Sequence, residues 1–405
     1  MASKGRDGVN GGGSDVSASN RDEGASDGPS DGDVEIGGVT APGRRADYLA
    51  VYEAFYSLNL GARLTNSLIT EAFARILNME DRDRRNIFLG ALLTGLMSRG
   101  PTVNEICALV RTALDRDGLL QRPRLEAAIP GGKRLVGVAG SGKKGLKTIN
   151  ITTPAALVAA SAGAFVVKVG SRSTSSLTGA VELAAALGIK LDIPLSDAMR
   201  GLSRTGFAMF DVSYGIPRFD SVYGGRFHSP TPLSFALPAL LCPVRYDVLL
   251  YGLAHPNVEL SLKALRELGV EDAMIVSSTH DDLHFVDEMN VLGRSVICGM
   301  RSGMIGRVLT IDVRTELGLP AYAPEDVAEG RSARDNVAAV VSVLRGAGTE
   351  AHRDVVCVNA ANVLYLAGIT GELRAGYELA RDRLRSGAAW AKVQEVVSAT
   401  GGSDP

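Results

Sequence analysis

The chain has 405 residues, with 43 lysines and arginines against 45 aspartates and glutamates. This near-balance excludes a grossly basic nucleic-acid-binding protein, although it leaves room for a local basic patch. The length predicts two to three domains, and a hydrophobic content of 45% is ample for globular cores. The chain has no apolar run of the roughly 18 residues that a membrane-spanning helix needs, so we expect no membrane partner.

The first 45 residues differ from the rest in composition. They contain eleven glycines, six serines and no aromatic residue. Such a segment buries too little apolar surface to offset its chain entropy, which predicts a disordered tail over residues 1–45. The tail lacks the apolar region of a secretory signal and is rich in acidic residues, unlike a transit peptide. Together with four separate cysteines that form no C-x-x-C pair, this predicts a cytoplasmic protein with reduced thiols.

Residues 46–120 carry the apolar spacing of helices, which predicts a small N-terminal helical domain. Thr65 is a candidate cap for a helix whose apolar residues recur at spacings of three and four. The run from Ile87 to Met97 is apolar nearly all round and predicts a deeply buried helix. Thr102 followed three residues later by Glu105 fits a capping box that opens a third helix.

Residues 121–405 show short apolar runs alternating with helical segments. Strands are predicted at 135–138, 165–169, 248–253, 273–277 and 355–358, and helices at 153–163, 259–268 and 360–366. This alternation predicts an α/β domain with a central mixed, mostly parallel sheet flanked by helices. Ligands of such sheets bind on loops at the carboxyl ends of the strands.

A glycine-rich loop follows the first predicted strand. The segment from Gly137 to Lys143 nearly matches the P-loop pattern G-x-x-x-x-G-K-[ST], but Lys144 stands where a hydroxyl should meet Mg²⁺. Glycines let the backbone approach a phosphate closely, while N–H groups and lysines supply donors and charge. We interpret the loop as another kind of phosphate cradle, with a structural turn as the alternative. Its candidate residues are Gly140, Ser141, Gly142, Lys143 and Lys144.

Two hydroxyl-rich segments extend this pattern. Thr153 before Pro154 is expected to cap a helix, whose N-terminus favours anions. The loop from Lys168 to Gly179 places two cations and a row of hydroxyls after a buried strand, which suits a diphosphate; a solvated serine-rich loop is the alternative. The candidate phosphate-binding residues here are Thr148, Asn150, Thr152, Thr153, Lys168, Ser171, Arg172, Ser175 and Ser176.

Acidic residues follow a later predicted strand. Asp287 and Glu288 can hold Mg²⁺, because carboxylate oxygens are preferred ligands of that ion. His280 and His284 are four residues apart, but they lack the H-E-x-x-H pattern of a zinc site. A solvated acidic turn is the alternative for the whole segment.

Together these motifs resemble those of the anthranilate phosphoribosyltransferase family, over about residues 48–397. The family's N-I-S-T motif appears at 150–153, its K-H-G-N-R-x-x-S-S loop at 168–176 and its D-E pair at 287–288. Its C-terminal N-A-A-x-x-L-Y-x-A-G is intact at 359–368. The resemblance implies transfer of phosphoribosyl from phosphoribosyl diphosphate (PRPP) to an aromatic acceptor, with release of diphosphate and with Mg²⁺ as cofactor.

The resemblance also implies roles for single residues. Lys168 and Arg172 would act on the diphosphate, and Arg226 would bind the acceptor carboxylate. Without the resemblance, the sequence around Arg226 indicates only a surface arginine. The helical domain would include part of 190–212 and would pair two chains into a homodimer. The implied metal-binding residues are Thr152, Asp287 and Glu288.

The departures from the family pattern fall in the glycine loop and around the acceptor. Where the family has G-T-G-G-D, this chain reads G-S-G-K-K at 140–144, so the charge of the loop rises by three. Val169 and Ser171 replace a histidine and an asparagine of the family. The added lysines are expected to strengthen phosphate binding or to replace the charge of one metal ion. We therefore expect a specialised relative that uses the same donor and another acceptor, anthranilate or a related amino- or hydroxybenzoate.

Two other functions fit the same fold. A non-catalytic paralogue that binds nucleic acid would use the lysine pair on the phosphate backbone. The retained Asn150, Lys168 and Arg172 and the near-neutral charge argue against it, so nucleic acid is a disfavoured partner. A nucleoside phosphorylase would share the fold, yet the loop at 168–179 resembles the transferase pattern better.

Overall fold

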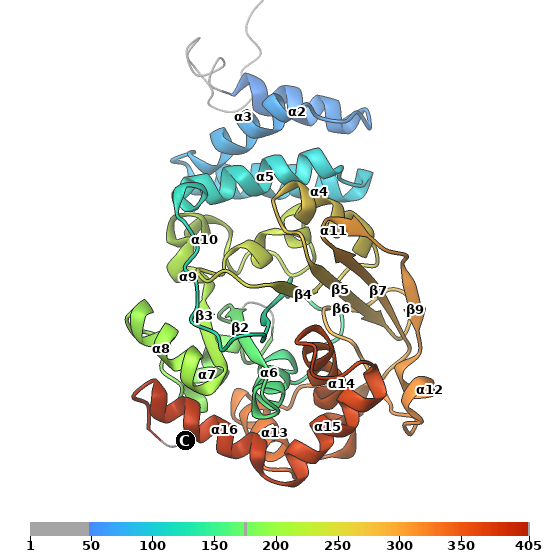
Figure 1. The fold of residues 1–405 in the computed structure, drawn as a ribbon. Helices are drawn as coiled ribbons and strands as arrows, with labels where there is room; N and C mark the ends of the chain where they lie inside the picture. Colours follow the sequence, from blue (N-terminus) through green and yellow to red (C-terminus); the bar gives the residue numbers. More distant parts are fainter. Residues whose placement is uncertain (1–47, 174–175, 404–405) are drawn as a thin grey trace, which may run out of the picture. The chain divides into compact units, whose positions relative to one another are not determined.

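The computed structural model describes residues 48–173 and 176–403 (Figure 1). The tail over residues 1–45, for which we predict disorder, lies outside these ranges, and so does Ser175. Within the described ranges no helix combines the length and the apolar character needed to cross a membrane.

Four helices form the N-terminal part of the described chain, and their caps follow from local sequence. The Thr65 hydroxyl accepts a hydrogen bond of 3.3 Å from the Leu68 N–H at the start of the second helix. Thr102 and Glu105 form the predicted capping box of the fourth. Both predicted caps are therefore confirmed. The helices are α2 (Leu49–Asn59), α3 (Asn66–Leu77), α4 (Arg82–Arg99) and α5 (Val103–Arg116).

Helix α4 is not buried all round, contrary to the prediction from its apolar run. Leu89, Leu92 and Leu96 are fully buried, but Ile87 is 67% exposed. Only one face of α4 contacts α2, α3 and a 3-10 helix at Pro232–Phe235, which leaves the Ile87 face uncovered.

A mixed sheet of nine strands forms the centre of the larger part (Figure 1). The path β3-β2-β1-β4-β5 is parallel, whereas β5-β7, β7-β8, β5-β6 and β7-β9 are antiparallel pairs. This confirms the predicted mixed sheet, although its described pairs are divided equally, four parallel and four antiparallel. The strands are β1 (Leu135–Gly140), β2 (Phe165–Gly170), β3 (Phe207–Asp211), β4 (Val248–Gly252), β5 (Ala273–Thr279), β6 (Phe285–Val286), β7 (Arg294–Arg301), β8 (Met304–Ile305) and β9 (Leu309–Ile311).

The sheet separates two hydrophobic cores, because successive side chains of a strand point to opposite faces. On β1, Leu135 and Ala139 join a core that includes α2 to α5. Val136 and Val138 join a second core with residues of α6, α14 and α16.

The remaining helices are α6 (Thr152–Ser161), α7 (Ala180–Ala186), α8 (Leu195–Thr205), α9 (Val212–Gly215), α10 (Pro217–Tyr223), α11 (Val258–Glu267), α12 (Val313–Leu317), α13 (Ala333–Leu344), α14 (Glu350–Leu366), α15 (Leu373–Arg385) and α16 (Ala388–Ala399). Four 3-10 helices complete the described elements: η1 (Leu119–Gln121), η2 (Pro232–Phe235), η3 (Leu237–Leu240) and η4 (Pro324–Asp326).

The strand predicted at 355–358 is wrong: these residues lie inside helix α14, which also contains the helix predicted at 360–366. Thirteen of the 17 residues of α14 are buried, where it packs against α15 and α6. A helix that is buried on most sides shows no 3.6-residue pattern of polar positions, so its apolar run resembles a buried strand.

The family resemblance implies that part of 190–212 belongs to the helical domain, but the structure places this segment elsewhere. Its helix α8 packs against β3 and α16 (Figure 1). The helix α10 and the segment η2 contact α5 instead. The connections between the helical part and the sheet therefore come from 217–235 and from α11, which also lies against α5.

Candidate active site

A cavity lies beyond the carboxyl ends of the parallel strands β1 and β2. It is walled by the loop after β1, the loop after β2, the segment 212–241 and the pair at 287–288. The structure brings nearly all residues of the sequence hypothesis to this cavity, although they come from distant parts of the chain. These residues are Gly140, Ser141, Gly142, Lys143, Lys144, Thr148, Asn150, Thr152, Thr153, Lys168, Ser171, Arg172, Ser176, Asp287 and Glu288.

The glycine loop is held in place by hydrogen bonds from both of its sides. The Gly142 N–H donates to Asp287 Oδ2 at 2.7 Å, and the Ala254 N–H donates to Ser141 Oγ at 2.9 Å. Gly142 and Lys143 both have left-handed backbone conformations, with φ of 62° and 60°. A non-glycine residue in this region costs conformational energy, so the surrounding contacts must hold Lys143 there.

Lys144 pairs with the two carboxylates of the predicted metal site. Its Nζ lies 2.6 Å from Glu288 Oε1 and 3.8 Å from Asp287 Oδ1, and its side chain is 20% exposed. The Thr152 hydroxyl donates to the same Glu288 Oε1 at 3.1 Å. Burial and the neighbouring Asp287 raise the pKa of Glu288, and Lys144 opposes that rise. Burial lowers the pKa of Lys144, but the two carboxylates outweigh it and raise that pKa. The ammonium of Lys144 is thus a built-in counter-charge for the acidic pair.

The acidic pair also retains oxygens that suit a hard cation. Asp287 Oδ1 and Glu288 Oε2 are buried and accept no hydrogen bond from the described residues. No group of three or more His, Cys, Asp or Glu side chains within 48–173 and 176–403 is arranged to hold a metal. Mg²⁺ is commonly bound by one or two carboxylates, with water and substrate phosphates completing its shell. Asp287 and Glu288 therefore fit a Mg²⁺ ion that arrives together with a phosphate ligand.

The positions of His280 and His284 do not support a zinc site either, which the sequence already disfavoured. The His284 Nδ1 lies 2.6 Å from Asp281 Oδ2, and the His280 Nε2 lies 3.7 Å from the same atom. Neither histidine lines the cavity. They belong to a surface turn stabilised by Asp281, whose pKa these contacts lower.

Lys168 is the most deeply buried cation of the cavity. It lies on β2 and is only 4% exposed. Burial lowers its pKa to about 8, although Asp287 and Glu288 partly oppose this effect. A buried ammonium near an anion-sized space interacts strongly with negative charge, because little water screens it.

Helix α6 begins one residue earlier than predicted. Its first residue is Thr152 and its cap is Ile151, which supplies no side-chain hydrogen bond, so the predicted Thr153 cap is wrong. The first N–H groups of a helix have no partner within the helix. Because Thr152 and Thr153 line the cavity, this uncapped N-terminus can accept an anion there.

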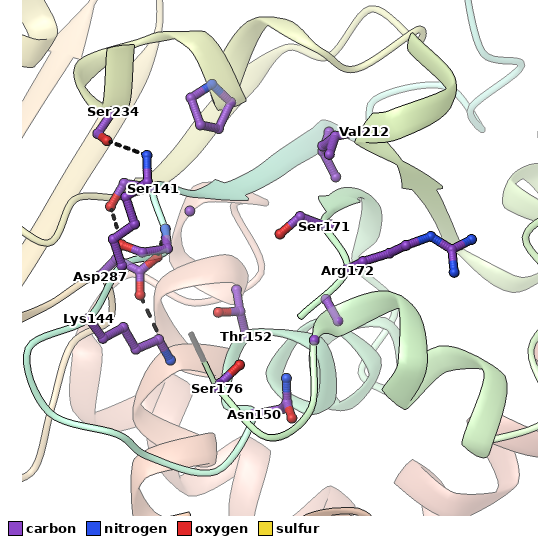
Figure 2. A pocket seen from close by; sticks show the side chains of 18 of the residues that line it. Ser141, Lys144, Asn150, Thr152, Ser171, Arg172, Ser176, Val212, Ser234 and Asp287 are labelled. Atoms are coloured by element: carbon purple, nitrogen blue, oxygen red, sulfur yellow. Dashed lines mark hydrogen bonds and ion pairs between the residues drawn. The ribbon is translucent and has the colours of Figure 1, made fainter. Parts of the chain in front are cut away.

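The loop after β2 is divided between the cavity and its outer edge. Figure 2 shows Thr152, Ser176 and Asn150 between Lys144 on one side and Arg172 on the other. The Asn150 amide donates to Thr178 O at 3.1 Å, which fixes the position of its side chain. Arg172 extends away from the centre in Figure 2, and its Nε lies 3.4 Å from Asp211 Oδ2. Arg172 therefore lies at the edge of the cavity and is oriented by Asp211.

One end of the cavity is aromatic and apolar. Tyr223 stacks with Phe219 at 5.1 Å and with Phe227 at 5.2 Å between ring centroids. Sequence reasoning missed this wall, because its members show no spacing that distinguishes them from core residues. The further residues that line this end are Val212, Ile216, Leu233 and Leu237.

Arg226 does not line the cavity, unlike the other residues of the sequence hypothesis that the structure describes. Its side chain is exposed and its Nη1 donates to Gly224 O at 3.0 Å. Arg226 follows Gly225, whose φ of 71° forms a turn, and this places the guanidinium on the surface. Asp220 was missed by sequence reasoning and does line the cavity, where burial raises its pKa.

Gly252 is expected to tolerate no side chain, because a Cβ there would lie 1.7 Å from Asp287 O. We expect Gly252→Ala to lower the free energy of unfolding by about 1–3 kcal/mol, since the loop that carries Asp287 must shift. Urea denaturation measures this change. Gly299→Ala is the matched control on strand β7, because its Cβ would meet Ala273 O at 4.0 Å. Equal stability of the two variants would contradict the tight contact at Asp287.

Comparison with known proteins relates this site to one family. The chain matches the model of the glycosyl transferase family, a/b domain, over residues 132–390. It is 32% identical over 320 residues to the anthranilate phosphoribosyltransferase of Shewanella amazonensis, an alignment that covers 76% of this chain and 86% of that protein. It is 33% identical over 314 residues to that of Pyrobaculum aerophilum, covering 77% of this chain and 88% of that protein.

Solved structures give the same relationship at the level of the fold. The anthranilate phosphoribosyltransferase of Thermus thermophilus superimposes with a TM-score of 0.68 at 25% identity, covering 87% of this chain and 99% of that one. The enzyme of Saccharomyces cerevisiae in complex with PRPP and Mg superimposes with a TM-score of 0.69 at 17% identity, covering 87% and 98%.

Proposed function

Because this chain belongs to the anthranilate phosphoribosyltransferase family of glycosyltransferases, we propose that it transfers phosphoribosyl from PRPP to an aromatic acceptor. The acceptor is anthranilate or a related amino- or hydroxybenzoate, and diphosphate is released. One observation carries the proposal: a single cavity joins a cationic and hydroxyl-rich half to an aromatic half. The first half suits a diphosphate and the second a flat ring.

The donor half would hold the diphosphate through backbone and side-chain donors that are already in position. The uncapped N-terminus of α6 and the fixed amide of Asn150 support this assignment. Ser175 belongs to the same hypothesis and lies outside the described residues. The proposed donor-binding residues are Gly140, Ser141, Gly142, Lys143, Lys144, Thr148, Asn150, Thr152, Thr153, Lys168, Ser171, Arg172, Ser175 and Ser176.

Asp287 and Glu288, with Thr152 beside them, would hold Mg²⁺ on the diphosphate. The buried oxygens Asp287 Oδ1 and Glu288 Oε2, which accept no hydrogen bond from the described residues, support this assignment. When bound, the ion supplies positive charge to the leaving group. Lys144 adds a fixed positive charge at the same carboxylates.

The proposed reaction is a substitution at the anomeric carbon of the ribose. The bond to the diphosphate oxygen breaks, and the nucleophilic atom of the acceptor forms the new bond: the amino nitrogen of an aminobenzoate, or an electron-rich ring carbon of a hydroxybenzoate. The acceptor loses one proton to solvent. Lys168 and Lys144 would stabilise the departing negative charge, while the two halves of the cavity would hold the reactants in contact. Arg172, oriented by Asp211, would add charge at the outer edge of the site.

The test is to incubate the protein with PRPP, Mg²⁺ and a panel of aminobenzoates and hydroxybenzoates and to follow diphosphate release. We expect release with at least one acceptor and none without protein. We further propose a role in specialised metabolism, supported by the altered glycine loop at 140–144, so the preferred acceptor need not be anthranilate itself. A panel without any diphosphate release would contradict the proposed transfer.

We also propose that the helical part pairs two chains into a homodimer. It exposes large apolar side chains on α2, just after it and on α4: Leu49 is 65% exposed, Tyr56 73%, Leu60 85% and Ile87 67%. Several large exposed apolar side chains on one part of a protein favour contact with a protein partner. We expect light scattering to give the mass of two chains and Ile87→Lys to lower it, with exposed Gln394→Lys on α16, outside the helical part, as the matched charge control. A single-chain mass for the wild type would contradict the proposal.

A further inference from the structure

The two adjacent lysines of the glycine loop point to different parts of the cavity. Lys144 reaches the acidic pair at the donor half. The Lys143 Nζ lies 4.6 Å from the centroid of the Tyr223 ring, at the aromatic half, and donates to the Tyr223 hydroxyl. It also donates to Ser234 Oγ at 3.3 Å. Lys143 has a left-handed backbone conformation, with φ of 60°, at the point where the side chains of Lys143 and Lys144 take different directions.

Lys143 faces neutral groups only. In the part of the chain that the structure describes, none of the ion pairs involves Lys143, whereas Lys144 pairs with two carboxylates. A cation in a partly enclosed, apolar-walled site gains most from a negatively charged ligand, because few water molecules compete there. Among the described residues no carboxylate pairs with the positive charge of Lys143, although Asp220, on the same helix as Tyr223, also lines the cavity.

The hydroxyl groups around Lys143 are themselves held in position. Tyr223 and Thr231 share a hydrogen bond of 2.7 Å between their hydroxyls, and the Thr231 N–H donates to Ser234 Oγ at 3.1 Å. Ser234 is 1% exposed. This frame holds the ammonium of Lys143 beside the ring of Tyr223, which is the face that an aromatic ligand would contact.

We propose that Lys143 binds an anionic substituent, a carboxylate in the first instance, on the aromatic acceptor. The inference rests on the proposed function and assigns to Lys143 the recognition of the carboxylate that the proposed acceptors carry. Arg226, the residue that the family resemblance suggests for this role, does not line the cavity and donates to Gly224 O on the surface. This assignment moves Lys143 from the donor half, where the sequence motif had placed it, to the acceptor half, where its ammonium lies beside Tyr223 and Ser234. Lys143 thereby becomes the residue that sets acceptor specificity, and a neutral aromatic amine is a poor ligand of this site.

The experiment compares two small ligands that differ in one charge. Binding of anthranilate and of its neutral amide is measured by calorimetry, without turnover, on the wild type, Lys143→Met, Lys143→Arg and Arg226→Met. A charge-assisted hydrogen bond contributes about tenfold or more to affinity. We expect the wild type, Lys143→Arg and Arg226→Met to prefer anthranilate by about tenfold or more, and Lys143→Met to lose that preference.

The outcomes separate this inference from the proposed function. A preference that survives in Lys143→Met, or is lost in Arg226→Met, overturns the inference, and so does a wild type that binds neither ligand. A thermal unfolding midpoint close to that of the wild type shows that Lys143→Met is folded. PRPP is titrated with Mg²⁺ into the same samples: normal PRPP binding without a carboxylate preference leaves the donor half of the proposed function intact. Absent PRPP binding counts against the proposed function alone.

Discussion

Lys144→Met is expected to lower the free energy of unfolding by about 3–5 kcal/mol, because it leaves two buried carboxylates without their cation. Glu288 is 3% exposed and Asp287 is 7% exposed, so water cannot replace the lost ammonium. Urea denaturation at neutral pH measures the change. Lys143→Met is the matched control in the same loop, since it removes hydrogen bonds to two hydroxyls only and costs about 1 kcal/mol.

The pH dependence of the stability of Lys144→Met tests whether the lost charge pairing causes its lower free energy of unfolding. Without Lys144 the pKa of Glu288 rises further above its ordinary value of 4.5, because burial and Asp287 raise it and the cation that most opposes them is gone. A carboxyl whose pKa is raised in the folded state binds more protons there than in the unfolded state, so stability falls as pH rises from about 4.5. The deficit of Lys144→Met should therefore shrink on acidification and in the double variant with Glu288→Gln. A loss of stability that changes neither with pH nor in the double variant would contradict the pairing of Lys144 with the carboxylates.

Lys168→Met is expected to lower kcat/KM for diphosphate release by about 10²–10³-fold, as removal of a preorganised electrostatic group does in other enzymes. Lys168 is the buried cation of the proposed donor half, and its removal creates no new charge. Steady-state kinetics with PRPP varied measures the effect. A variant with wild-type kcat/KM would show that Lys168 does not act on the diphosphate.

The same residue predicts a pH dependence of PRPP affinity. Because burial lowers the pKa of Lys168 to about 8, its ammonium is present below that pH and is lost above it. Binding of an anion above pH 8 must first take up a proton, so the affinity should fall by up to about tenfold per pH unit. Calorimetry at pH 7 and pH 9 tests this, with Lys168→Arg expected to remove most of the decline because arginine stays charged. An affinity equal at both pH values would contradict the assignment.

Sequence patterns over a few residues predicted the helix caps and several strands. The caps at Thr65 and Thr102 were predictable because a cap is a hydrogen bond across three residues. Four of the five parallel strands were predictable from short apolar runs, whereas β3 was missed. The strand order was not predictable, because strand pairing depends on contacts far apart in sequence. Helix α14 was mistaken for a strand because it is buried on most sides.

The donor half of the site was predictable because its residues occur in short motifs directly after β1 and β2. The directions of Lys143 and Lys144 were not, since one depends on Tyr223 and the other on Glu288, residues 80 and 144 positions away. The turn at Gly225 was likewise hidden, and it separates Arg226 from the cavity that its sequence neighbours Tyr223 and Phe227 line.

The central claim is that this cavity binds PRPP with Mg²⁺, and isothermal titration of the full chain with PRPP tests it most directly. We expect saturable binding of one PRPP per chain, stronger with Mg²⁺ than with a chelator, and weakened by Lys168→Met. Titrations that show no magnesium-dependent binding of PRPP to the wild type would contradict the account.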